Sequence, residues 1–171
     1  PSIDRWIVLE DERAARMATE RLLAEGHRRI GFIGGQQNLD TAARRYAGYL
    51  SALEAAGAQA DPRLRAFAEY TPEGGAKAAA QILEAASSVT ALVVSHSHPA
   101  LGAWSMLRRR GMRVPEDISL IGINRLPEES FRFPAMTRVE LPFRGVGRRA
   151  VELALDTPPT EPIHEVFEGP V

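Results

Sequence analysis

The stretch GMRVPEDISLIGIN, residues 111–124, decides the fold class of this chain. Its first glycine is typical of a helix end, RVPED of a tight turn, and ISLIGI of a buried strand. This order places Asn124 and Arg125 at the carboxyl end of a strand. Ligands bind at that end of the strands in open α/β sheets. The same stretch therefore predicts a fold class and the position of a binding site.

Outward from this stretch, short apolar runs alternate with segments of helical periodicity along most of the chain. TALVVS, residues 90–95, is the clearest buried strand. Strands that alternate with helices of about ten to fifteen residues predict right-handed crossovers and a parallel sheet. We therefore expect a three-layer α/β fold of flavodoxin-like type, with helices on both faces of the sheet and strand centres at residues 30–33, 67–69, 92–94 and 119–121.

Helices are indicated by apolar residues three and four positions apart and by end signals such as Thr71-Pro72-Glu73. We expect helices at residues 11–25, 41–56, 72 onward, 99–110 and 144–155. The expected inner faces are Ala43, Tyr46, Ala47, Leu50 and Leu53 in the second helix, and Ala76, Ala79, Ala80 and Leu83 in the third. As domains, we expect a lead-in strand and helix at 1–28, a subdomain at 29–136 and a return segment at 137–171.

Composition excludes several classes of function. The net charge of -1 means that the chain by itself lacks the basic excess needed for binding nucleic acid. The absence of Cys excludes disulfides and thiolate chemistry. No apolar run reaches the roughly 20 residues of a membrane span, and the start shows no signal segment, so we expect no membrane partner and a cytoplasmic location. WIVL, residues 6–9, reads as a strand with nothing before it to pair with, which suggests a piece of a longer protein.

Several motifs, in order, resemble the effector-binding core of the lac and purine repressor family of bacterial transcription regulators: LLAEGHRRIGFIGG, TAARRYAGYLSALEAAG, YTPEGGAKAAAQIL, the stretch from TALVVSHSHPALGAW to RVPEDISLIGIN, PAMTRVELP and GRRAVEL. They span roughly residues 10–155, and GHRRI and RVPEDIS are the most specific. The resemblance implies a periplasmic-binding-protein-like C-terminal subdomain, closure of two subdomains on a small-molecule effector, and a homodimer. It also implies operator DNA binding through a headpiece that this chain lacks.

Two routes lead to the same candidate site. The sheet places a ligand over the strand ends, near residues 34–41, 70, 95–98 and 124–125. The resemblance puts the effector contacts of the family at nearly the same positions. The candidate ligand-binding residues are Thr41, Arg45, Tyr70, His96, Ser97, Asn124 and Arg125. Two of them also have a simpler interpretation, because Arg45 could be a solvated helix arginine and Tyr70 a core aromatic.

The chain departs from the family pattern at two places. His96-Ser97 stands where the family usually has Asn-Asp, and Asn124-Arg125 follows a strand that the family usually ends with Asp. Two carboxylates that accept hydrogen bonds from sugar hydroxyls are thus absent, and cationic groups have entered. Two alternatives follow: the effector is an anionic sugar derivative or carboxylate rather than a neutral sugar, or the site no longer binds a ligand.

Other motifs give weaker indications. His96 and His98 could be read as a metal pair, but no Cys, Asp or Glu lies near them in the sequence, which disfavours a metal site. Gly34-Gly35 lacks a phosphate-binding pattern. Glu10-Asp11 and Glu128-Glu129 are read as solvated or capping acids, so we expect no cofactor and no catalytic residues. The alternatives left open are a small flavodoxin-like or Rossmann-like enzyme with His96 or His98 as base, and a periplasmic solute-binding protein.

Overall fold

A computed structural model describes residues 5–124, 136–155 and 162–167. The chain divides into two compact units, one formed by residues 11–139 and one by residues 1–10 and 140–171. The boundaries expected at 28/29 and 136/137 differ from this division. The first helix belongs to the larger unit because it packs along the second helix.

The larger unit contains a parallel sheet of five strands in the order β3-β2-β4-β5-β6. The strand that corresponds to TALVVS lies third in this order, as expected for a buried central strand. The predicted fold class is confirmed, although the strand expected at 67–69 lies two residues earlier. The strands are β2 (Ile30–Gly34), β3 (Arg65–Phe67), β4 (Ala91–Val94), β5 (Ser119–Ile123) and β6 (Arg138–Val139).

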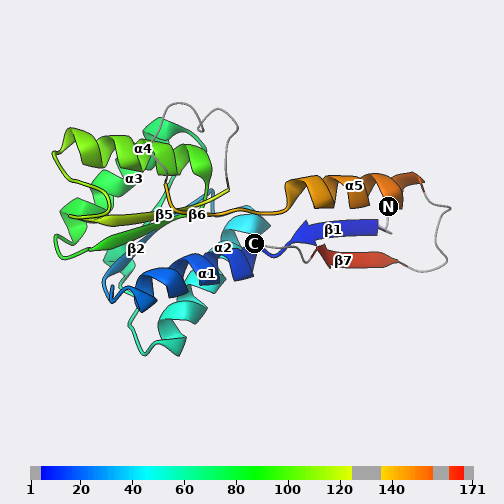
Figure 1. The fold of residues 1–171 in the computed structure, drawn as a ribbon, viewed down its shortest axis with the longest axis horizontal. Helices are drawn as coiled ribbons and strands as arrows, with labels where there is room; N and C mark the ends of the chain where they lie inside the picture. The colour runs from blue at the N-terminus through cyan, green and yellow to red at the C-terminus, as the bar shows by residue number, and fades with distance from the viewer. Residues whose placement is uncertain (1–4, 125–135, 156–161, 168–171) are drawn as a thin grey trace. The chain divides into compact units, whose positions relative to one another are not determined.

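Helices cover both faces of this sheet, as Figure 1 shows. Successive strand residues point to opposite faces, so Phe32 and Val93 pack on one side and Ile33 and Val94 on the other. The first side is covered by α1 (Asp11–Ala24) and α2 (Asp40–Ala55), and the second by α3 (Pro72–Ala85) and α4 (Ser97–Arg109), with a short 3-10 turn at Pro62–Leu64. As expected, Thr71 caps α3, its hydroxyl accepting from the Gly74 N–H at 3.0 Å.

The inner faces of two helices differ from the expectation. In α2 the buried residues are Ala42, Arg45, Gly48, Tyr49, Ala52 and Leu53, and in α3 they are Gly75, Ala78, Ala79 and Ile82. Of the expected residues, Leu53 and Ala79 are buried, and Tyr46, Leu50, Ala76, Ala80 and Leu83 are partly buried against the core. Ala43 and Ala47 are exposed, so the buried face is turned by about one residue from the expected one. A Cβ added at Gly48 would overlap the backbone oxygen of Glu12 in α1, and one at Gly102 in α4 would overlap that of Pro72. These glycines allow each helix pair to pack at close range.

The amino edge of the sheet is held together by the two most specific sequence motifs. His27 of GHRRI bonds through Nδ1 to the Thr90 hydroxyl and through Nε2 to the Ser119 hydroxyl, both at 2.9 Å. In RVPEDIS, Asp117 accepts from the backbone and the guanidinium of Arg113. Both motifs therefore serve the structure of the edge opposite the candidate site.

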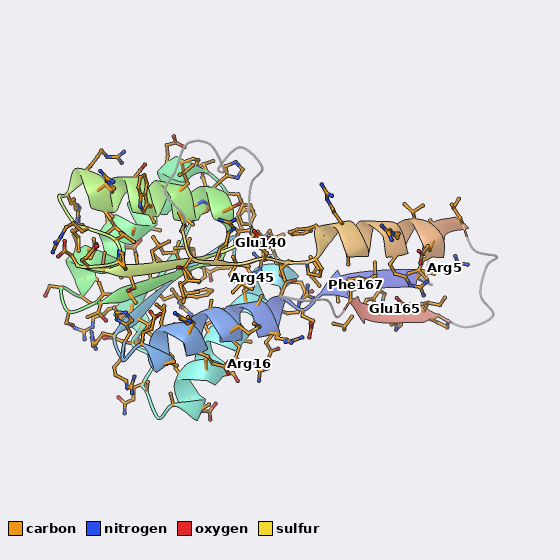
Figure 2. The ribbon with its side chains drawn as sticks, in the orientation of Figure 1. Arg5, Arg16, Arg45, Glu140, Glu165 and Phe167 are labelled. Carbon is orange, nitrogen blue, oxygen red and sulfur yellow. The ribbon has the colours of Figure 1, made fainter. Side chains whose placement is uncertain are left out.

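The smaller unit consists of β1 (Arg5–Leu9), β7 (Ile163–Phe167) and α5 (Phe143–Leu155). β1 pairs with β7 in parallel, so the strand expected at residues 6–9 finds its partner in the tail of the chain. Figure 2 shows Arg5, Glu165 and Phe167 on this strand pair, and Arg149 of α5 donates from Nε to Glu165 at 2.9 Å. None of the described helices is both long and apolar enough to span a bilayer.

Candidate ligand-binding site

The candidate residues lie where the strands of the larger unit end. Because the sheet is parallel, the carboxyl ends of β2, β3, β4 and β5 lie at one edge. Tyr70 follows β3, His96 follows β4, and Asn124 follows β5 directly. Thr41 and Arg45 lie in the first turns of α2, which follows β2 after a short loop. The topology therefore brings segments from across the sequence to one edge of the sheet.

Arg45 is buried, with only 2% of its surface exposed, so its interpretation as a solvated helix arginine is wrong. Its Nε donates to Asp11 Oδ1 at 2.8 Å, its Nη2 lies 2.7 Å from the same oxygen, and its Nη1 donates to the carbonyl oxygen of Ser95. Figure 2 labels Arg45 near the strand ends. Burial lowers the arginine pKa, and the Asp11 carboxylate opposes that effect.

Asp11 is a functional candidate that the sequence interpretation missed. It was read as a solvated or capping acid, yet it is 4% exposed. Its Oδ1 accepts from Arg45 and its Oδ2 from Arg44 Nη2 at 3.1 Å, while Arg44 also pairs with the exposed Asp40. A signal was available, because an arginine at a buried position of an amphipathic helix needs an acid partner.

Tyr70 and His96 form an aromatic pair beside this arginine. Their ring centroids are 4.2 Å apart with planes at 54°, and the Tyr70 ring also lies against Gly35, where a Cβ would overlap it. His96 Nδ1 bonds to the Ser95 hydroxyl at 2.9 Å. Burial and the charge of Arg45 lower the pKa of His96 to about 3, so the imidazole is neutral near pH 7.

Asn124 has a left-handed backbone, with φ of 74°, and its N–H donates to the Val139 oxygen at 2.9 Å. Its Oδ1 is buried without a hydrogen-bond partner in the described part of the chain.

Ser97 is buried at the start of α4, and Thr41 is half-buried. Direct contacts join Arg45, Ser95, His96 and Tyr70, whereas Thr41, Ser97 and Asn124 share only the sheet edge. Arg125 lies outside the described residues.

The side chains at this edge are suited to hydrogen bonding. Within the described ranges, no group of three or more His, Asp or Glu side chains could hold a metal ion. His98 is exposed on α4 while His96 is partly buried. A guanidinium, a neutral imidazole, an aromatic ring and an amide remain as the groups that a ligand would meet.

Known proteins share the sequence pattern and the fold of this chain. Residues 19–170 match the model of the periplasmic binding protein-like domain. The chain belongs to that family. The repressor CytR of Escherichia coli K12 is 36% identical over 148 residues, which cover 86% of this chain and 43% of CytR.

Solved structures of this family share the fold. A transcriptional regulator CelR–cellobiose complex has a TM-score of 0.91 at 32% identity, covering 98% of this chain and 52% of that one. A sugar-binding regulator of the LacI family from Escherichia coli, complexed with phosphate, has a TM-score of 0.78 at 28% identity, covering 92% and 58%. The chain thus spans about half the length of these relatives.

Proposed function

We propose that this chain is the effector-binding and dimerisation part of a bacterial transcription regulator of the lac repressor type. Family membership over residues 19–170 supports the proposal, together with relatives that are themselves transcriptional regulators. The regulator would bind operator DNA in the cytoplasm through a headpiece in the longer protein. An effector that binds one conformation more tightly shifts the population toward it and so changes the DNA affinity.

The chemistry of the sheet edge favours a ligand that carries hydroxyl groups. The guanidinium of Arg45 has more N–H groups than its contacts with Asp11 and Ser95 use, so donors remain on Nη1 and Nη2. Asn124 Oδ1 is an acceptor without a partner in the described residues. A hydroxyl both accepts and donates, and Tyr70 offers a ring face for a sugar ring. The relative that was solved with cellobiose supports a sugar as effector.

An anionic effector now has less support than the sequence alone gave it. Asp11 compensates Arg45, and His96 is neutral near pH 7. The remaining support for an anion is Arg125, which lies outside the described residues, and the relative that was solved with phosphate.

The enzyme alternative has little support. An imidazole whose pKa lies at about 3 is a weak base near pH 7, and His98 is exposed on α4. Relatives of this chain are regulators rather than enzymes.

Titration of the full-length protein with neutral sugars and with sugar phosphates and uronates tests the proposal. We expect one ligand to bind with a dissociation constant in the micromolar range and to change operator affinity. Arg45→Gln should weaken that binding at least tenfold, whereas Arg16→Gln, an exposed arginine on α1, should leave it unchanged. Binding that survives Arg45→Gln would refute the role of Arg45, and a protein that binds no operator would refute the regulator.

Self-association is part of the same proposal. The family resemblance and the apolar, Trp-bearing segment 99–107 favour a contact through this helix and a loop at residues 126–133, and that loop lies outside the described residues. α4 has a half-buried Trp104 with Arg108 above its ring, 5.2 Å from the centroid. Sedimentation of the full-length protein should show a dimer at micromolar concentration. A monomer at high micromolar concentration would contradict the proposal.

A further inference from the structure

The position of Asp11 is fixed by the close packing of two helices. Asp11 begins α1, and Arg45 lies one turn before Gly48 in α2. Gly48 contacts the backbone of Glu12, the residue next to Asp11, so closely that a Cβ would not fit. This contact brings the Asp11 carboxylate within hydrogen-bonding distance of the Arg45 guanidinium. The ion pair is therefore built by the backbone packing of α1 on α2.

The pair leaves little excess charge at the strand ends. Asp11 is 4% and Arg45 is 2% exposed, so solvent screens their charges poorly. Asp11 Oδ1 lies within 2.8 Å of two Arg45 nitrogens, Nε and Nη2. Arg44 forms ion pairs with both Asp11 and Asp40, so each of the two arginines has an acid partner. An anionic ligand would have to compete with a carboxylate that is already in contact with the guanidinium. A neutral ligand needs only the N–H groups that remain.

We propose that Asp11 is a specificity-determining residue of the site: it holds the Arg45 guanidinium against Ser95 and cancels its charge, so that the site selects uncharged hydroxyl-bearing ligands over anions. The proposal rests on the proposed function for the identity of the ligand class. The charge balance itself is a property of the described residues and can be measured without an effector.

A purely structural ion pair would hold α1 to α2 without affecting ligand charge. The two roles differ in what Asp11→Asn does to anion binding. Removing only the charge of Asp11 leaves Arg45 as a buried cation without its partner, and an anion is then the group that best stabilises it. A structural role predicts lower stability and no new preference. A specificity role predicts that inorganic phosphate begins to bind at Arg45.

The experiment is a titration of the full-length protein with inorganic phosphate at constant ionic strength, followed through the Nε–H signals of ¹⁵N-labelled arginine. The Arg45 signal is assigned by its loss in Arg45→Gln. In the wild type we expect no saturable shift of this signal. In Asp11→Asn we expect a saturable shift and phosphate affinity at least tenfold higher. Asp40→Asn is the matched control, because it removes the same charge from an exposed carboxylate that pairs with Arg44 and not with Arg45 among the described residues, and it should behave as the wild type.

Further variants keep the result decisive if Asp11→Asn folds poorly. The double variant Asp11→Asn/Arg45→Gln lacks both charges and should fold without binding phosphate, and Asp11→Glu should retain the wild-type response. Saturable phosphate binding at Arg45 in the wild type overturns the proposal without any variant. Equal phosphate affinity in Asp11→Asn and the wild type also overturns it. Because the probe is phosphate, failure to find a sugar effector refutes the proposed function and leaves this result standing.

Discussion

At the amino edge of the sheet, polar side chains bond to one another, whereas at the carboxyl edge several retain unused hydrogen-bonding groups. His27, Thr90 and Ser119 form a closed set at the amino edge, and Arg29 Nε is the exception there. At the carboxyl edge Asn124 Oδ1 has no partner among the described residues, and Arg45 keeps spare N–H groups. The most recognisable motifs of the chain therefore stabilise the fold, while the proposed binding groups lie at the opposite edge in less distinctive residues.

The largest effect on stability is expected at Arg45. Arg45→Gln removes the main partner of a buried carboxylate, which costs about 3–5 kcal/mol for a buried pair. We expect about 3 kcal/mol, because Arg44 still bonds Asp11 at 3.1 Å. Urea denaturation measures the change. The double variant Asp11→Asn/Arg45→Gln should be more stable than Arg45→Gln alone, and equal or lower stability would show that the pair is not coupled.

The next largest effect depends on pH. His96 has a pKa of about 3 in the folded protein against an ordinary value of 6.5. Between about pH 3 and pH 6.5 the unfolded chain therefore binds a proton at His96 that the folded chain does not. The free energy of unfolding is thus not reduced by His96 above about pH 6.5, and it decreases as the pH falls toward 3. We expect His96 to account for a loss of up to about 2 kcal/mol between pH 7 and pH 5. Urea denaturation at both pH values, with His96→Asn beside the wild type, checks this. Equal losses in the two proteins would contradict the depressed pKa.

Sequence patterns predicted the fold better than they predicted the site. Strand and helix order follows from local apolar periodicity, so the parallel sheet was foreseen and is confirmed. The inner face of α2 was not foreseen, because the expected face left out Arg45, which was predicted as a ligand-binding residue near the start of the helix. Its burial depends on Asp11, which lies 34 residues away in the sequence. The contact between Tyr70 and His96 joins two separate loops, and no local pattern encodes it.

A smaller effect is expected at the amino edge. His27→Ala removes two hydrogen bonds and leaves the Thr90 and Ser119 hydroxyls without that partner. We expect a loss of about 1–2 kcal/mol in the free energy of unfolding, with ligand affinity unchanged within about twofold. His98→Ala, which removes an exposed histidine, is the control and should change neither quantity. A large loss of ligand affinity in His27→Ala would show that the two edges are coupled.

The smallest effect on stability is expected at Asn124, where binding should change instead. Its φ of 74° lies in the left-handed region, which glycine adopts at little cost, so Asn124→Gly should change the free energy of unfolding by less than about 1 kcal/mol. The same substitution removes Oδ1, the acceptor without a partner in the described residues. Loss of one hydrogen bond to a ligand hydroxyl costs about 1 kcal/mol, so the dissociation constant should rise roughly fivefold to tenfold. Asn124→Ala separates the two contributions, because it also lacks the acceptor but strains the backbone by about 1–2 kcal/mol. Equal affinity of Asn124→Gly and the wild type for the effector would remove Asn124 from the site and leave its backbone geometry as its only role.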